Sequence, residues 1–196
     1  MQKRKAESKI LTEPIPKADA SQTKGTIMDV FEAIRTRASV RSLKPCLVTE
    51  QELEQILDAG RRAPSGYNRQ PWEFILIRDR TILDQLGRIQ SCISEGFAAI
   101  AFVMDERASK YWKEDAGAAI ENMLLAVVAL GYASVWVEGY VLNQEDYGKK
   151  VLGVPKHLRL LAILPIGMPA VSPQQARKKP LGELVYYDTY GNSEKP

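Results

Sequence analysis

The sequence is poor in the residues from which most metal sites and nucleophilic active sites are built. Its 196 residues include one histidine and two cysteines. His157 has no second histidine with which to bind a metal, and Cys46 and Cys92 lack the spacing of metal ligands. Two cysteines also cannot build a disulfide framework, which fits a reducing, cytoplasmic location. We therefore predict neither a metal site nor a structural disulfide network.

Several common motifs are missing as well. The chain has no Gly-x-Gly-x-x-Gly pattern of a Rossmann dinucleotide site, no Gly-x-x-x-x-Gly-Lys-Ser/Thr phosphate loop and no His-Glu-x-x-His zinc motif. The most apolar run, residues 116–130, contains Glu121 and Asn122 and is short for a membrane span. The N-terminus lacks the continuous apolar core of a signal peptide. We expect a chain without a membrane span or an export signal.

Charge is distributed unevenly along the chain. The formal net charge is +3, and residues 1–25 hold six basic and three acidic side chains. That segment accounts for the whole excess, since residues 26–196 hold 21 of each sign. A nucleic-acid-binding surface needs clustered positive charge, so we expect none in this balanced body. We expect residues 1–25 to form a flexible polar tail and residues 26–196 to form one domain.

Apolar periodicity predicts helices alternating with short strands. A first helix should begin near Thr26, and a second should follow Thr49, which forms a capping box with Glu52. A long helix over residues 113–130 is apolar on nearly every side and is followed by Gly131, a typical C-terminal glycine. Shorter helices are predicted over 82–89 and 145–152, and strands over 72–77, 99–104, 134–137, 160–166 and 184–187. This alternation indicates a sheet flanked by helices.

The segment Arg37-Ala38-Ser39-Val40-Arg41 carries two guanidinium groups around a hydroxyl. If the segment is extended, Arg37, Ser39 and Arg41 share one face. A phosphate with two negative charges needs such a convergent set of donors. The residues alone leave open a solvated basic helix end, because cations are also favoured there.

A second segment, residues 63–74, runs Ala-Pro-Ser-Gly-Tyr-Asn-Arg-Gln-Pro-Trp-Glu-Phe. Its proline ends a helix, and the amides of Asn68 and Gln70 present donors and acceptors suited to a flat heteroaromatic ring. An ordinary connection between a helix and a strand explains the proline, serine and glycine. It does not explain the spacing of the two amide residues before Pro71 and Trp72.

Two weaker patterns lie further along the chain. Val137-Glu138-Gly139 comes at the end of a predicted strand, and a strand followed by a turn glycine explains it equally well. The run Arg177-Lys178-Lys179 precedes Pro180, and basic runs of this length are usually solvated surface.

Together these motifs resemble the nitroreductase family of flavin-dependent oxidoreductases, over roughly Thr26 to Gly191. The family pattern Arg-Arg-Ser-x-Arg is matched from Arg37 to Arg41, with Ala38 in place of the second arginine. The pattern Ala-Pro-Ser-x-x-Asn-x-Gln-Pro-Trp is matched over residues 63–72 and is the most specific of the motifs.

The resemblance implies an α+β fold of three layers, with a central mixed sheet flanked by helices and a C-terminal strand exchanged in a homodimer. It also implies bound FMN and reduction of small electron-poor molecules, such as nitroaromatics and quinones, by ping-pong hydride transfer from NADH or NADPH. No side chain is implied as a proton donor. The implied FMN-binding residues are Arg37, Ala38, Ser39, Arg41, Arg177 and Lys178 toward the phosphate, Pro64, Ser65, Gly66, Asn68 and Gln70 toward the partner's flavin, and Val137, Glu138 and Gly139 at the redox edge.

Two alternatives remain at this point. Relatives of the fold also catalyse narrower flavin reactions such as reductive dehalogenation, usually with extra lid segments. The roughly 35 residues from Ile77 to Lys113 leave little room for such a lid. The second alternative is a flavin-binding dimer without enzymatic activity.

Overall fold

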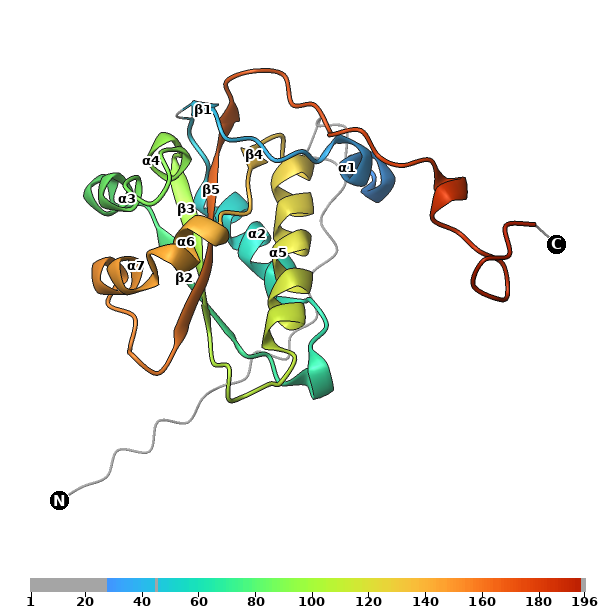
Figure 1. Ribbon diagram of the computed structural model, residues 1–196. Helices are drawn as coiled ribbons and strands as arrows, with labels where there is room; N and C mark the ends of the chain where they lie inside the picture. The colour runs from blue at the N-terminus through green and yellow to red at the C-terminus, as the bar shows by residue number, and fades with distance from the viewer. Residues whose placement is uncertain (1–27, 45, 195–196) are drawn as a thin grey trace.

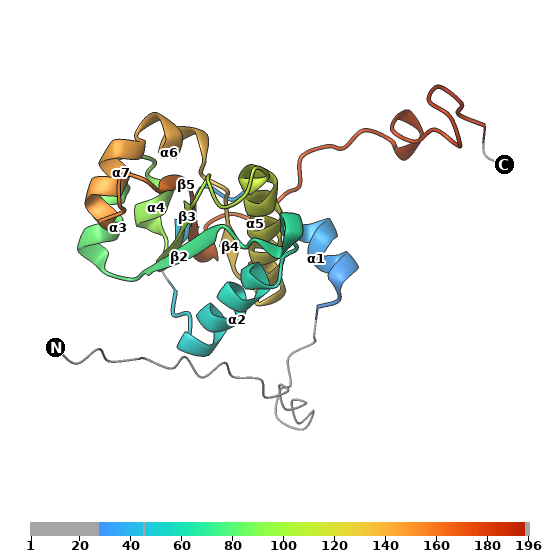
Figure 2. The ribbon, with the colours of Figure 1, turned by 90° about the horizontal axis from the view of Figure 1, so that it is seen from below.

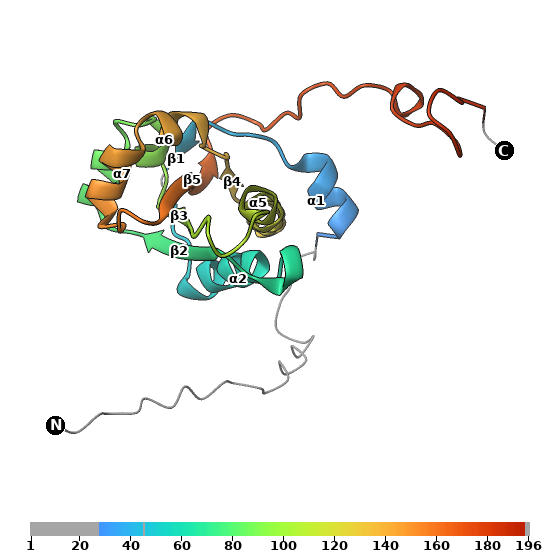
Figure 3. The same ribbon diagram turned by 60° about the horizontal axis from the view of Figure 1, so that its bottom comes forward.

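The computed structural model describes residues 28–44 and 46–194 of the chain (Figure 1). The expected polar tail and the expected helix start at Thr26 lie outside these residues. The described chain forms three layers, with a β-sheet between two groups of helices (Figures 1 and 3). The α+β class and the three-layer arrangement are therefore confirmed.

The central sheet has five strands in the order β1-β5-β3-β2, with β4 also paired to β5. Its strands are β1 (Leu43–Lys44), β2 (Trp72–Ile77), β3 (Ala98–Met104), β4 (Ala133–Ser134) and β5 (Arg159–Pro169). We expected a mixed sheet, but every pairing between these strands is antiparallel. Parallel pairing among the described residues is confined to the bridge between Ser39 and Ser134. One edge of β2 has no neighbouring strand in the described chain.

Strand β3 lies at the centre of the hydrophobic core, because all its residues are buried. Successive side chains of a strand point to opposite faces. Accordingly, Ile100 and Phe102 pack in the cluster shared with α5, and Ala101 and Val103 pack in the cluster on the other face. The first face is covered by α2 (Glu50–Arg61) and α5 (Trp112–Ala129), with α1 (Val30–Thr36) packed on the outer side of α5 (Figure 3). The second face is covered by α3 (Arg80–Leu86), α4 (Cys92–Glu95), α6 (Gly139–Asn143) and α7 (Glu145–Leu152).

The long helix α5 lies between the sheet, α1 and α2 (Figure 3). Ile120, Met123 and Val127 are among its buried side chains, as the apolar run predicted. Gly131 ends the helix with a positive φ of 85°. Its N–H donates to the Val128 carbonyl at 2.9 Å, and the N–H of Tyr132 donates to the Val127 carbonyl at 3.0 Å. These two bonds define a Schellman motif, which confirms the predicted C-terminal glycine.

The predicted capping box at the start of α2 is also confirmed. Thr49 Oγ1 accepts from the Glu52 N–H at 3.2 Å, and Glu52 Oε2 accepts from the Thr49 N–H at 2.8 Å. The Thr49 hydrogen bonds lower the pKa of Glu52. The Tyr132 hydroxyl also donates to Glu52 at 3.0 Å, and burial together with this carboxylate raises the pKa of Tyr132 to about 12. The contact ties the start of α2 to the turn that ends α5.

Three predicted elements differ from the structure. Helix α1 starts at Val30 with Asp29 as its N-cap, and the apolar side chains of Val30, Phe31 and Ile34 are 58%, 70% and 49% exposed. The predicted strand over 134–137 is reduced to β4 and a separate bridge between Val137 and Ile163. The predicted strand over 184–187 does not form within this chain. These residues follow the short helix η2 (Leu181–Glu183) and have no strand beside them.

Two glycines of the α5 region allow a matched test of stability. Gly131→Ala should lower the free energy of unfolding by about 1 kcal/mol, because alanine is strained at this positive φ. Gly117→Ala should raise it by about 0.5–1 kcal/mol, since alanine favours a helix interior. A Cβ at Gly117 meets only a Trp136 ring atom, at 3.6 Å. Chemical denaturation at one fixed protein concentration measures both, and equal effects of the two substitutions would contradict the assignment.

Candidate active site

The phosphate segment, residues 37–41, leaves the C-terminal end of α1 and runs beside β4. The N–H of Val40 donates to the Ser134 carbonyl at 2.9 Å, which holds the segment in an extended form. Ala38 and Val40 are buried, so Arg37, Ser39 and Arg41 lie on the opposite, outward face. The burial of residues 38 and 40 thus alternates with the greater exposure of residues 37, 39 and 41, as an extended segment predicts.

Arg37 is held in place by an acidic residue of α5. Its Nε lies 3.2 Å from Glu121 Oε1, and the Arg37 side chain is only 20% exposed. An ion pair this close to solvent contributes about 0–1 kcal/mol to stability. Its main effect is to restrict the orientation of the guanidinium group.

The strand-end segment, residues 137–139, begins three residues after Ser134, the bridge partner of Ser39. Val137 exchanges two backbone hydrogen bonds with Ile163, at 3.1 and 2.9 Å. Gly139 then opens α6 and is exposed. A Cβ at Gly139 would meet nothing within 4 Å, and its φ does not lie in the left-handed region. Since the protomer itself does not require a glycine here, the bare backbone is suited to the close approach of a ligand.

The amide loop, residues 64–70, is strained. Tyr67, Asn68 and Gln70 have positive φ angles of 53°, 55° and 48°. Asparagine tolerates this region, whereas tyrosine and glutamine are placed there at a cost of about 1–2 kcal/mol each. The Ser65 side chain accepts from the Gln70 N–H at 2.9 Å, and its carbonyl accepts from the Asn68 N–H at the same distance. Such strain concentrates at functional sites.

The loop is anchored by a residue that we did not select from the sequence. Asp115 is 5% exposed, and its Oδ1 accepts from the Gly66 N–H at 2.7 Å. Its Oδ2 accepts from the Ser109 hydroxyl at 2.7 Å. The available signal was an acidic residue at the start of an otherwise apolar helix. Its partner lies 49 residues away, which no local pattern reveals.

The amide loop and the phosphate segment meet α5 on different sides. Gly66 binds Asp115, whereas Arg37 pairs with Glu121, six positions further along the helix. Six residues of an α-helix span about 9 Å and separate side chains by about 120° around the axis. Figures 2 and 3 show α2, which leads into the amide loop, and α1, which leads into the phosphate segment, on different flanks of α5.

The C-terminal segment returns toward the phosphate segment. The Gln175 side-chain amide donates to the carbonyls of Ile34 and Arg37, both at 3.1 Å. Arg177 is two residues further, and consecutive Cα atoms are about 3.8 Å apart. The structure thus brings the chain of Arg177 and Lys178 near Arg37, although both side chains are exposed and neither has an ion pair among the described residues.

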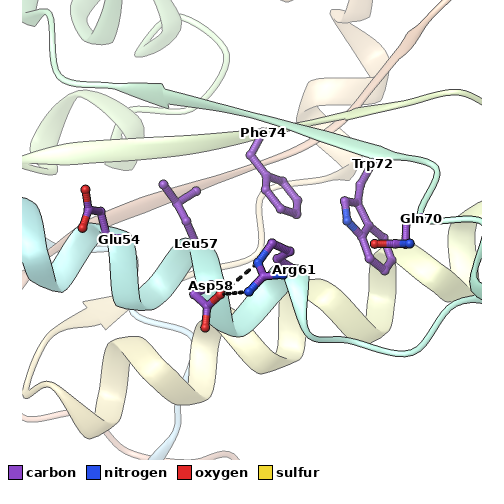
Figure 4. Close-up of a pocket in the computed structure, with 7 residues that line it drawn as sticks. All are labelled: Glu54, Leu57, Asp58, Arg61, Gln70, Trp72 and Phe74. Carbon is purple, nitrogen blue, oxygen red and sulfur yellow. Dashed lines mark hydrogen bonds and ion pairs between the residues drawn. The ribbon is translucent and has the colours of Figure 1, made fainter. Parts of the chain in front are cut away.

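An apolar groove runs between α2 and the free edge of β2 (Figure 4). Leu57, Trp72 and Phe74 form its apolar floor, and the groove has a volume of about 770 Å³. Its polar rim consists of Glu54, Asp58, Arg61 and Gln70, and Arg61 Nε donates to Asp58 Oδ1 at 2.9 Å. The groove therefore extends from the amide loop along an unpaired strand edge.

Other chemistries find little support in the described residues. Residues 28–44 and 46–194 contain no cluster of three or more histidine, cysteine, aspartate or glutamate side chains able to hold a metal. Both cysteines are free, and burial raises the pKa of Cys92 to about 11, so its thiol stays protonated at neutral pH. None of the helices in this part of the chain is both long and apolar enough to cross a bilayer.

Comparison with known proteins identifies the family. The model of the nitroreductase family matches residues 34–99 and 93–168. The chain belongs to the nitroreductase family. It is 33% identical over 153 residues to a protein of Methanothermobacter thermautotrophicus provisionally named an NADH dehydrogenase/NAD(P)H nitroreductase, covering 74% of this chain and 80% of that protein.

Further relatives give this nitroreductase-family chain a structural and a chemical context. The crystal structure of a provisionally assigned nitroreductase from Desulfovibrio desulfuricans, in complex with FMN, is 33% identical with a TM-score of 0.71, and the match covers 82% of this chain and 97% of that one. Iodotyrosine deiodinase of Thermotoga neapolitana is 25% identical over 189 residues, covering 82% of this chain and 98% of that enzyme. The family match spans the phosphate segment, the amide loop and the strand-end segment, but not Arg177 and Lys178.

Proposed function

We propose that the protein is an FMN-dependent oxidoreductase that uses NADH or NADPH to reduce small electron-poor molecules such as nitroaromatics and quinones. The observation that carries the proposal is the alternation of burial in the phosphate segment, in which Ala38 and Val40 are buried while Arg37, Ser39 and Arg41 are more exposed. The exposed backbone of Gly139 nearby supports it. Relatives named as NAD(P)H nitroreductases and the FMN complex of a relative support the choice of cofactor and donor.

In this proposal the phosphate segment binds the phosphate of FMN. Guanidinium groups suit this task because they remain charged and donate several hydrogen bonds in a fixed geometry. Glu121 orients Arg37 before the cofactor binds. Ala38 supplies only backbone, because its side chain is buried. Arg177 and Lys178 add positive charge at the same end, since Gln175 fixes their segment to the carbonyl of Arg37.

The strand-end segment supports the flavin ring. The chemistry that FMN supplies when bound is hydride transfer from the nicotinamide to the acceptor. Gly139 is exposed at the start of α6, and the hydrogen bonds of Val137 with Ile163 and of Glu138 with Leu142 fix the backbone that leads into it. We assign no side chain as a proton donor, and an open site lets solvent protonate the reduced product.

The working form in this proposal is a homodimer, in which the amide loop serves the flavin of the partner. The different flanks of α5 occupied by the loop and by the phosphate segment support this division. So do the exposed apolar side chains of α1, since monomers rarely leave such clusters uncovered. We further propose that residues 184–187 of one protomer add to the free edge of β2 in the other and cover the apolar groove.

The direct test of the proposed function is the visible absorption spectrum of the purified protein, followed by turnover. We expect FMN at about one per chain, NAD(P)H oxidation that depends on it, and reduction of both a nitroaromatic and a quinone. A halogenated tyrosine serves as the third acceptor, because a deiodinase is among the relatives. A colourless protein that does not take up added FMN would refute the proposal. Turnover of the halogenated substrate alone would replace it with the narrower reaction.

Substitution of Arg37 should separate binding of the phosphate from binding of the ring. Arg37→Gln should weaken FMN binding about tenfold or more, as expected for loss of a charge-assisted hydrogen bond. It should leave the affinity for riboflavin, which has no phosphate, nearly unchanged. Fluorescence titration with the two ligands measures both values. Arg88→Gln, an exposed arginine beyond α3 on the other face of the sheet, is the control. Equal weakening of FMN and riboflavin by Arg37→Gln would contradict the assignment.

Polar substitution of the C-terminal segment should break the dimer. Leu184 and Tyr186 are 57% and 40% exposed in one protomer, and we expect both to be buried in the assembly. The double variant Leu184→Asp/Tyr186→Asp should therefore dissociate at concentrations where the wild type is dimeric, and should lose FMN with it. Sedimentation equilibrium measures the association constant, with Lys150→Asp on α7 as the control for added acidic charge. An unchanged dimer of the double variant would show that this segment is not part of the interface.

A further inference from the structure

We propose that Asp115 and Ser109 are positioning residues that hold the amide loop in its strained, ligand-ready form. The inference rests on the proposed function, which assigns the loop residues Ser65, Asn68 and Gln70 to the flavin. A ligand-ready loop is one that holds these residues in position for that flavin. Neither Asp115 nor Ser109 is assigned a contact with the cofactor. They act through the Gly66 backbone.

The first observation is the chemistry that surrounds Asp115. Its side chain is nine-tenths buried, yet it has no ion pair within the described residues. An isolated buried carboxylate is unfavourable unless hydrogen bonds compensate for lost water. Here the Gly66 N–H and the Ser109 hydroxyl each donate at 2.7 Å. The position in the first turn of α5 adds the favourable field of a helix N-terminus. The lost hydration of the Asp115 carboxylate is thus compensated only while the Gly66 N–H remains in place.

The second observation is that the same cluster encloses Gly66 on its other side. The Tyr111 N–H donates to Ser109 Oγ at 3.1 Å, which fixes the backbone before α5. The Tyr111 ring then packs so closely on Gly66 that a Cβ there would lie 2.4 Å from its Cδ2. The rings of Tyr67 and Tyr111 are 6.5 Å apart at their centroids. Gly66 is therefore held by the hydrogen bond to Asp115 and by contact with the Tyr111 ring.

The third observation is that the loop needs an external constraint. Tyr67 and Gln70 occupy the left-handed region without the local preference that glycine or asparagine would bring. The internal bonds from Ser65 join loop residues only to one another. The Asp115 bond at Gly66 is the polar side-chain contact in the described residues that ties residues 64–70 to a helix. We infer that it sets the position of the whole loop on α5.

A positioning role differs from simple packing in what each substitution should do. Asp115→Leu fills similar space but removes both acceptors, so the loop should relax. Asp115→Asn keeps an acceptor for Gly66 and should retain most of the loop order. Ser109→Ala removes one of the two donors and should have an intermediate effect. Asn122→Ala is the matched control, because Asn122 lies on the same helix and donates to the Ala59 carbonyl of α2 at 3.1 Å.

The experiment measures the local order of the amide loop directly, on the full-length protein and before FMN is added. Amide hydrogen exchange of Gly66 and tryptic cleavage after the exposed Arg69 should both be about tenfold or more faster in Asp115→Leu than in the wild type. Asp115→Asn and Asn122→Ala should remain close to the wild type. In a second step, FMN binding should weaken about tenfold or more in Asp115→Leu alone, the factor for losing a hydrogen bond to a charged group.

The outcomes separate this inference from the proposed function. Unchanged exchange and cleavage in Asp115→Leu would overturn the inference, and so would equal acceleration in Asn122→Ala. If Asp115→Leu does not fold, the same comparison is made with Ser109→Ala, and wild-type exchange there would also overturn it. Failure of the wild type to bind FMN would instead refute the proposed function, while the exchange and cleavage rates would still report on the loop.

Discussion

The requirement to cover α5 organises both the fold and the candidate site. This helix is apolar on almost all sides, so it is stable only when other elements surround it. The sheet covers one side, and α1 and α2 cover two others (Figure 3). Helix α2 continues into the amide loop, and α1 continues into the phosphate segment. The turn at Gly131, which ends α5 itself, leads through β4 to the strand-end segment. Burial of one helix thus fixes the positions of three motifs that are far apart in sequence, with the amide loop and the phosphate segment on different flanks of α5.

Elements with local signals could be predicted from the sequence. The capping box at Thr49, the Schellman glycine, the apolar run of β2 and the helical pattern of α7 depend on residues within a few positions of one another, and the structure has each of them where it was expected. Strand direction could not be predicted in this way, because it depends on pairings between distant segments. The same limit hid Asp115, whose role is defined by a backbone N–H on another element. The roles of the site residues remain predictions that the substitutions above test.

Two predicted elements are exposed in the protomer for a common physical reason. The first predicted helix, α1, leaves Val30, Phe31 and Ile34 exposed, and the predicted strand over 184–187 leaves Leu184 and Tyr186 exposed. An apolar pattern reports that a segment is buried in the functional state, and it does not say which chain buries it. A strand also needs a neighbour to satisfy its backbone, and the free edge of β2 is a surface of that kind. The proposed homodimer would cover both exposed segments, and the proposed strand addition would pair the free edge of β2.

The distribution of unfavourable features also indicates where the site lies. Three of the four residues 67–70 in the amide loop are non-glycine residues in the left-handed region. The buried carboxylate of Asp115, which has no ion pair among the described residues, accepts from the N–H of Gly66 just before them. Either feature alone lowers stability, and neither is needed to join α2 to β2, since a relaxed turn would do so. Elsewhere in the described chain a non-glycine residue has a positive φ only at Asp188. A loop that is strained, and that a buried charge holds in that strain, is best explained by the orientation it gives to its amide side chains. Under the proposed function, the lower local stability of this loop is offset by the fixed positions of its polar groups at the edge of the flavin site.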